Sequence, residues 1–321
     1  MTRMRGPWIG AAAALAVAAA ISGCGGRAVA TPAPVPTPIL SGTAQLRLPI
    51  TSYDLSDTQS AEAEYLGQLY TQECMHGFGF EYLPGLSVSS IAENSRITAE
   101  LNSRRYGVSD PAAAATYGYH IPSWTKSAAA PMPFPRPGAP EFRVLTGQPA
   151  GSYHGRPVPA GGCIGQASGR LTAAGIDTGA QASGGPDQSA LVQQIASQGF
   201  ARAQADPRAR AVDARWTACM RSYGYAYATP FQAANHWNLN APVSTTEIQT
   251  AEHDIACKRQ VNLIGVEFAV ESDYENADIA RNAQALANDK TEIAADAAGL
   301  RRLMANVKTR PQPGDALHGA P

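Results

Sequence analysis

Hydrophobic residues recur along this chain mainly at helical spacing, which predicts a mainly α-helical fold. Ser56 and Gln59 have the spacing of a capping box, so a first helix is expected to begin there, with an apolar face that reaches Cys74. The strand signal is weak, because the only convincing alternation of apolar and polar residues lies at 140–146. Further helices are expected at 88–106, at about 163–174, from Pro186, from Asp206-Pro207 and from Ser244.

The helical pattern that begins at Ser244 is the longest, since no proline follows until Pro311. Its apolar residues first fall on two faces, so we expect a central helix at 245–270 that two halves of the domain share. No packing pattern continues through 272–276, where we expect a break. Beyond it, a heptad seam predicts contact with one neighbouring helix, either as core or as an exposed docking surface. The seam residues are Ile279, Leu286, Ile293 and Leu300.

Other segments lack helical periodicity. Residues 126–160 contain 8 of the 24 prolines, which predicts a long irregular loop. Its Pro-rich run is either a plain surface loop or a ligand for a proline-recognition module. A Gly/Ser-rich linker is expected at 175–185, and a disordered tail is expected at 309–321.

The N-terminus has the pattern of a bacterial lipoprotein signal. Two arginines precede an apolar stretch at 8–20, which is too short for a comfortable transmembrane helix. Residues 21–24, Ile-Ser-Gly-Cys, match a lipobox, in which Cys24 receives a lipid and the signal is cut before it. The alternative is an ordinary signal peptide with a nearby cysteine. We therefore divide the chain into a signal peptide at 1–23, a lipid-anchored Pro-rich tether at 24–45 and a helical extracytoplasmic domain at 46–308.

Apart from Cys24, the chain contains four cysteines. An even number in an exported chain predicts two structural disulfides, for which three pairings exist. No Cys-x-x-Cys sequence occurs, which argues against a thioredoxin-like redox motif and against a zinc knuckle. The four residues are Cys74, Cys163, Cys219 and Cys257.

A nine-residue repeat helps to choose the pairing. Residues 74–82 and 219–227 share the pattern Cys-Met-x-x-aromatic-Gly-aromatic-x-Tyr. Each copy follows a helical stretch, so Gly79 and Gly224 are expected to cap the two helices in the left-handed conformation. One further cysteine follows each copy, and two similar halves would therefore form the bridges Cys74–Cys163 and Cys219–Cys257.

Charge and motifs exclude several functions. The 25 Lys and Arg residues nearly balance the 26 Asp and Glu residues, and no basic block occurs, which argues against nucleic-acid binding. The chain lacks the motifs of zinc proteases, serine hydrolases, phosphate-binding loops and EF-hands. We therefore predict no catalytic residue, no metal site and no cofactor.

The six histidines are scattered. His253 and Cys257 have the i, i+4 spacing of a metal pair on a helix, although a disulfide accounts better for Cys257. His120 and His154 lie among aromatic residues in sequence. They are either candidates for lining a glycan or ligand groove, or buried structural histidines.

Five sequence blocks resemble a group of exported actinobacterial lipoproteins of uncharacterised function. The resemblance covers roughly residues 46–270 and implies a lipid site at Cys24, but it implies no catalytic residue. The blocks are LRLPITSY, ECMHGFGFEY, NSRRYGVSDPAAAATYGYH, VPAGGC and RWTACMRSYGY.

Together these features favour a lipoprotein on the outer face of the cell membrane, held there by membrane lipid through Cys24. We expect a non-catalytic binding or scaffolding module with an envelope protein or cell-wall partner. The alternative is an envelope hydrolase that acts on a glycan, peptide or lipid, with scattered His, Asp and Glu residues brought together by folding. An importer's solute-binding subunit is disfavoured, because the chain lacks alternating strands and helices.

Overall fold

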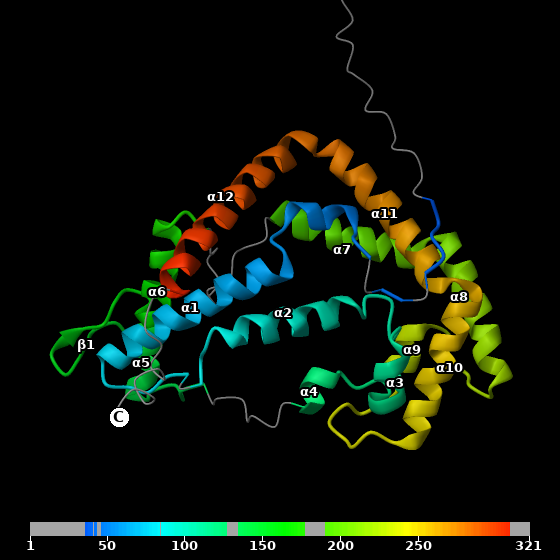
Figure 1. The fold of residues 1–321 in the computed structure, drawn as a ribbon, viewed down its shortest axis with the longest axis horizontal. Helices are drawn as coiled ribbons and strands as arrows, with labels where there is room; N and C mark the ends of the chain where they lie inside the picture. The colour runs from blue at the N-terminus through cyan, green and yellow to red at the C-terminus, as the bar shows by residue number, and fades with distance from the viewer. Residues whose placement is uncertain are drawn as a thin grey trace, which may run out of the picture. The chain divides into compact units, whose positions relative to one another are not determined.

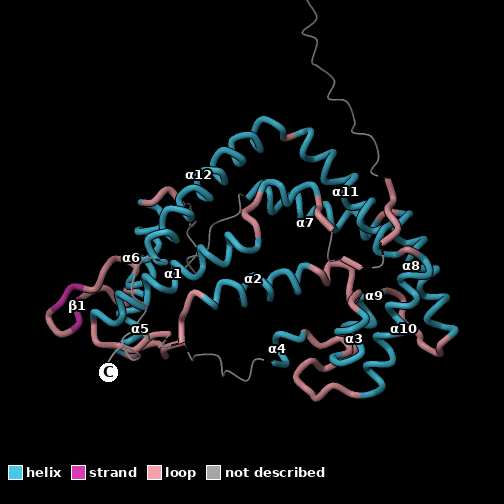
Figure 2. The backbone as a smooth tube through the Cα atoms, viewed as in Figure 1, coloured by secondary structure: helices cyan, strands magenta, loops and turns pink. Residues whose placement is uncertain are grey.

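The computed structural model describes residues 36–40, 42–43, 46–83, 85–126, 134–176 and 190–308. They belong to one of the two compact units into which the chain divides, Thr31–Pro321. The predicted signal peptide, the linker beyond residue 176, the helix start at Pro186 and the tail at 309–321 lie outside the described residues. The described part is mainly helical, as predicted (Figure 2). None of its helices is both long and apolar enough to cross a membrane.

The elements are labelled along the chain in Figure 1. Those before residue 177 are the 3-10 helix η1 (Pro49–Tyr53), α1 (Asp57–Gly77), α2 (Ser89–Asn102), α3 (Pro111–Tyr117), α4 (Pro122–Lys126), α5 (Pro140–Thr146), the antiparallel hairpin of β1 (Ser152–Tyr153) and β2 (Arg156–Pro157), and α6 (Gly162–Ala173). Those after residue 189 are α7 (Ala190–Ala205), α8 (Pro207–Ser222), α9 (Pro230–Ala234), α10 (Thr245–Val261), α11 (Leu263–Arg281) and α12 (Ala283–Lys308).

The buried side chains of the described residues form four clusters. The first lies between α1, α2, α6 and α12, and the second lies between α3, α8, α10 and α11. A third joins η1 and α7 to the start of α12, and a fourth joins the end of α1 to α5 and α6. The predicted central helix is less central than expected, because α10 packs against α3, α8 and α11 within the second cluster.

The two copies of the repeat end their helices in the same way. Gly79 after α1 has φ +88°, and Gly224 after α8 has φ +89°. In both copies the next residue donates its backbone N–H to the carbonyl five residues earlier, from Phe80 to Met75 and from Tyr225 to Met220. These are the left-handed caps that the sequence predicts, and the Ser56–Gln59 capping box of α1 is confirmed as well.

The C-terminal helices break at other places than predicted. α11 continues through 272–276, whereas breaks occur at Asn262, which is left-handed, and at Asn282 between α11 and α12. The apolar pattern is interrupted at 272–276 for a reason other than a break in the helix. The positions that face inward here, Glu271 and Glu275, are glutamates with no exposed surface. A helix that buries charged side chains shows no apolar stripe, although it packs on that face.

The alternation of apolar and polar residues at 140–146 does not form a strand, since these residues form α5. Pro140 occupies its first turn and Gly147 ends it in the left-handed conformation, which are helix boundary signals. Val144 and Leu145 are fully buried against α6, so the long loop predicted at 126–160 is partly structured. The helix at 88–106 likewise ends early, at Asn102, because the chain then turns to bring Arg105 to α11.

The heptad seam, which begins with Ile279 near the end of α11 and continues along α12, is core. Leu286 packs with η1 and α7 in the third cluster, and Leu300 packs with α1 and α6 in the first. Both side chains are fully buried, while Ile279 and Ile293 are partly buried against the same clusters. The seam is therefore divided between two neighbours, and it is not available as a docking surface.

The helical body begins earlier than the predicted boundary at residue 46. The Asn262 side chain accepts a hydrogen bond from the Leu40 N–H at 3.1 Å and donates one to the Pro38 carbonyl at 2.8 Å. Leu40 packs against the second cluster, and Thr43 is buried beside Ser109. The end of the predicted tether therefore packs on the helical body despite its prolines, because a proline carbonyl still accepts a hydrogen bond.

Candidate functional site

Two disulfides brace the body. They join Cys74 to Cys163 and Cys219 to Cys257, which is the pairing that the repeat predicts. Because Cys257 is bonded to sulfur, it does not form a metal pair with His253. Among the described residues, no group of three or more His, Cys, Asp or Glu side chains is arranged to hold a metal ion. The second bridge links the end of α8 to α10 and so fixes the position of the aromatic residues that follow α8.

We expect the double substitution Cys219→Ser and Cys257→Ser to destabilise the fold. The bridge closes a loop of 38 residues, and opening it increases the conformational entropy of the unfolded chain. The free energy of unfolding should therefore fall by about 2–4 kcal/mol. Urea unfolding followed by circular dichroism measures this loss. Addition of a reductant should destabilise this variant less than the wild-type protein, because only Cys74–Cys163 remains to be reduced. Equal stability of variant and wild type would contradict the bracing role.

The second repeat copy begins a continuous series of ring contacts, which we call the ring strip. It consists of Tyr223, His253, Tyr225, Tyr227, His236 and Trp237, in the order of their contacts. Tyr223 stacks on His253 with ring centroids 4.0 Å apart, and later steps range from 5.1 to 6.1 Å. Beneath its far end, Trp237 stacks on the buried ring of Tyr119. Three separate segments thus supply one strip: the turn after α8, the turn after α9, and α10.

Two of the six members of the ring strip are exposed to solvent, and the other four are partly buried. Tyr223 is 47% exposed, and His236 is exposed as well. The apolar spacing of α8 predicts that Tyr223 lies in one buried stripe with Val212, Trp216 and Met220, but only those three are fully buried. Tyr223 is the C-cap residue at the end of the helix, where it is exposed, whereas Tyr225 and Tyr227 beyond the Gly224 cap pack against the second cluster. Each ring of the strip combines a flat apolar face with a hydroxyl or ring nitrogen, although the indole nitrogen of Trp237 is buried.

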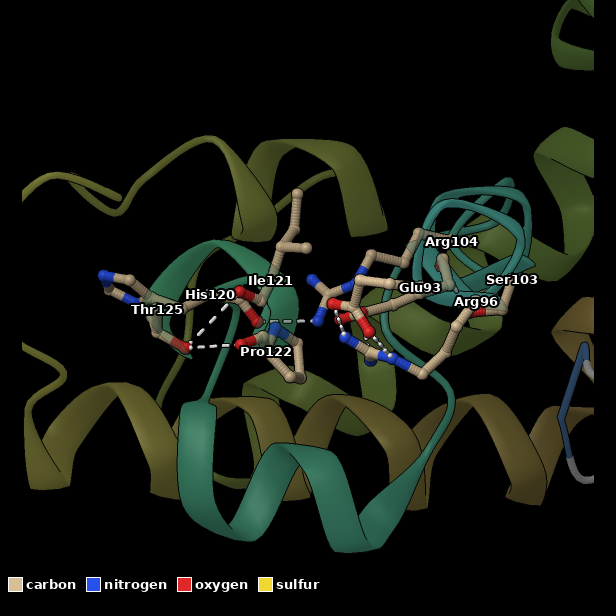
Figure 3. A network of polar contacts seen from close by, with 9 residues as sticks. Glu93, Arg96, Ser103, Arg104, His120, Ile121, Pro122 and Thr125 are labelled. Carbon is tan, nitrogen blue, oxygen red and sulfur yellow. Dashed lines mark hydrogen bonds and ion pairs between the residues drawn. The ribbon is translucent and has the colours of Figure 1, made fainter. Parts of the chain in front are cut away.

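His120 is a buried structural residue and not part of an open groove. It is 2% exposed, and its Nδ1 lies 2.8 Å from Glu247 Oε1 on α10. Its backbone carbonyl accepts a hydrogen bond from Arg104, which also binds the Tyr119 carbonyl; Figure 3 shows this guanidinium beside His120. Ser244 and Glu247 have the spacing of a capping box at the start of α10, but only half of the box forms. Ser244 caps the helix, while the Glu247 carboxylate turns inward to His120.

His154 lies elsewhere, in the turn of the hairpin, where it is exposed at φ +47°. Its ring contacts Tyr153, which packs against Phe80 of the first repeat copy. The hairpin also places Arg156 over the Phe78 ring at 4.4 Å. A hollow of about 320 Å³ lies nearby. It is lined by Met75, Glu81, Tyr82, Pro135, Arg136, Ala139 and Glu141. Neither histidine lines this hollow, and of the two interpretations His120 fits the buried structural one.

Behind the ring strip lies a network of buried charges. Lys258 and Asp254 are one turn apart on α10 and almost fully buried, with Nζ 3.0 Å from Oδ2. Asp254 also accepts hydrogen bonds from the Trp216 indole at 2.9 Å and the Tyr119 hydroxyl at 3.1 Å. Burial raises the pKa of Asp254 although Lys258 and these donors oppose the shift. The network holds α8, α10 and the turn after α3 in one arrangement.

Three buried glutamates of α11 extend this network. Glu271 is fully buried and accepts hydrogen bonds from the Arg105 guanidinium and the Tyr106 hydroxyl. Among the described residues, Glu267 forms no ion pair with an arginine or lysine, and its Oε2 accepts no hydrogen bond. Burial, with the charge of Asp213 as the next cause, raises the pKa of Glu267 to about 8. Burial also raises the pKa of Glu275 to about 7.

Sequence reasoning did not single out the ring strip. Its three tyrosines belong to the nine-residue repeat, but no sequence pattern links His236 and Trp237 to them. One signal was available: the second repeat copy has tyrosine at 223 and 225, where the first has Phe78 and Phe80. No protein-family model, curated protein or solved structure matches this chain.

Proposed function

We propose that this protein is an exported lipoprotein, held on the outer face of the cell membrane through Cys24, that works as a non-catalytic binding module of the envelope. The observation that carries the proposal concerns the cysteines. All four cysteines beyond Cys24 are consumed in two disulfides, which form and persist in oxidising compartments. Cys24 is left as the odd cysteine, directly after the apolar leader.

The charged residues support a binding role over catalysis. Glu267 and Glu275, whose pKa values are raised toward neutrality, lie between packed helices with at most 2% of their surface exposed. Such positions suit structural groups, because a substrate has no route to them. The ring strip supplies accessible rings on a rigid support, as binding surfaces require. We further propose that the chain belongs with the exported lipoproteins that it resembles.

Lipid attachment is tested with Cys24→Ser in a bacterial host that processes lipoproteins. We expect the wild-type protein to partition into detergent, with a diacylglycerol mass on its N-terminal cysteine peptide. Cys24→Ser should lose both properties, since serine has no thiol to acylate. Ser22→Ala keeps a small residue before the cleavage site and serves as the matched control. A wild-type protein with an unmodified Cys24 would refute the anchor.

A further inference from the structure

We propose that the ring strip binds a neutral glycan chain whose pyranose rings lie on the aromatic faces. This inference deepens the proposed function, on which it rests, by naming the ligand class of the binding module. It starts from a comparison within the chain, since the two repeat copies have the same cap geometry but different surroundings.

The first copy uses its aromatic residues for packing. The hairpin covers them: Tyr153 lies against Phe80 and Arg156 lies over Phe78. In the second copy the rings contact the other rings of the strip, and Tyr223 remains 47% exposed. Tyr225 and Tyr227 also pack against the second cluster, so the copies differ most at one position: partly buried Phe78 in the first and exposed Tyr223 in the second.

The chemistry of the strip matches a sugar. A pyranose has an apolar face of C–H groups and a rim of hydroxyls that donate and accept hydrogen bonds. All six members of the strip combine a flat apolar face with a hydroxyl or ring nitrogen at the edge, and none is a purely hydrocarbon side chain.

Charge and extent define the glycan further. The strip contains no Lys, Arg, Asp or Glu side chain. A polyanionic chain would need the basic residues that this strip lacks. The rings contact one another in order from Tyr223 to Trp237, so the strip is an elongated surface. Its two exposed members, Tyr223 and His236, lie toward opposite ends with partly buried rings between them, so they could contact different sugar units of one chain.

Calorimetric titration of the detergent-solubilised full chain tests the proposal. The probes are an N-acetylglucosamine hexamer, a glucose hexamer and, as a competing class, a proline decamer, because aromatic surfaces also bind polyproline. We expect at least one hexamer to bind and Tyr223→Ala to weaken it about tenfold. Tyr223→Phe should weaken it less, because it retains the face.

Phe78→Ala, at the equivalent position of the first copy, is the matched control and should leave glycan affinity within about twofold of wild type. His236→Ala provides a second exposed variant in the strip, and unchanged circular dichroism shows that each variant folds. Trp237→Phe should remove any fluorescence response of Trp237 to the glycan while heat of binding persists.

Absence of hexamer binding, equal weakening by Phe78→Ala, or binding of the proline decamer in place of the glycans would overturn the proposal. The lipid anchor is judged separately. Cys24→Ser should bind the hexamer like the wild type, so loss of lipid modification and loss of glycan binding are independent results.

Discussion

Lys258→Met is expected to lower the free energy of unfolding by about 3–5 kcal/mol, because it leaves a buried carboxylate without its cation. Lys258 is 1% exposed and Asp254 has no exposed surface. The amine also donates to the Val108 carbonyl at 2.9 Å, and this acceptor would lose its partner. Urea unfolding at pH 7 measures the loss.

A double-mutant cycle separates the ion pair from the shape of the site. Asp254→Asn keeps an oxygen that accepts from Trp216, and methionine fills the volume of the lysine stem. We expect the double variant to be more stable than Lys258→Met alone, since no unpaired charge is buried. Lys290→Met, on the exposed side of α12 over the Tyr53 ring, is the control and should change stability by less than about 1 kcal/mol. Similar losses at both lysines would contradict the buried pair.

Glu267→Gln is expected to stabilise the protein at pH 8 by up to about 4 kcal/mol and to have little effect at pH 4.5. The folded state raises the pKa of Glu267 from its ordinary 4.5 to about 8. Between these values the folded state binds more protons than the unfolded state, so the stability of the wild type falls as pH rises. Glutamine carries no charge and avoids this fall.

The groups that face Glu267 come from three other helices. Asp213 on α8 raises its pKa, whereas Lys258 on α10 and the Gln204 side chain on α7 lower it; Glu271, on α11 itself, raises it. Glu271→Gln is the matched control one turn away. It should destabilise the protein, because it weakens the contacts with Arg105 and Tyr106. Urea unfolding from pH 5 to 8 gives both profiles, and a Glu267→Gln profile parallel to the wild type would contradict the prediction.

Several parts of the fold could be predicted from sequence, because their signals are local. The capping box at Ser56 and the Asp206-Pro207 helix start depend on residues within one helical turn. The caps at Gly79 and Gly224 depend on glycine's freedom at positive φ, which needs no distant partner. The disulfide pairing also followed, since the repeat marked which cysteines occupy equivalent positions.

The charged interior and the ring strip were decided by tertiary structure alone. Arg105 and Glu271 are 166 residues apart, and neither residue's sequence neighbourhood indicates that a carboxylate of α11 points inward. The strip likewise needs the Cys219–Cys257 bridge to bring the turn after α8 against α10. An apolar side chain shows its burial by periodicity, because any apolar neighbour suits it. A charged or aromatic group at a specific contact depends on one distant partner, and only the folded chain brings that partner into place.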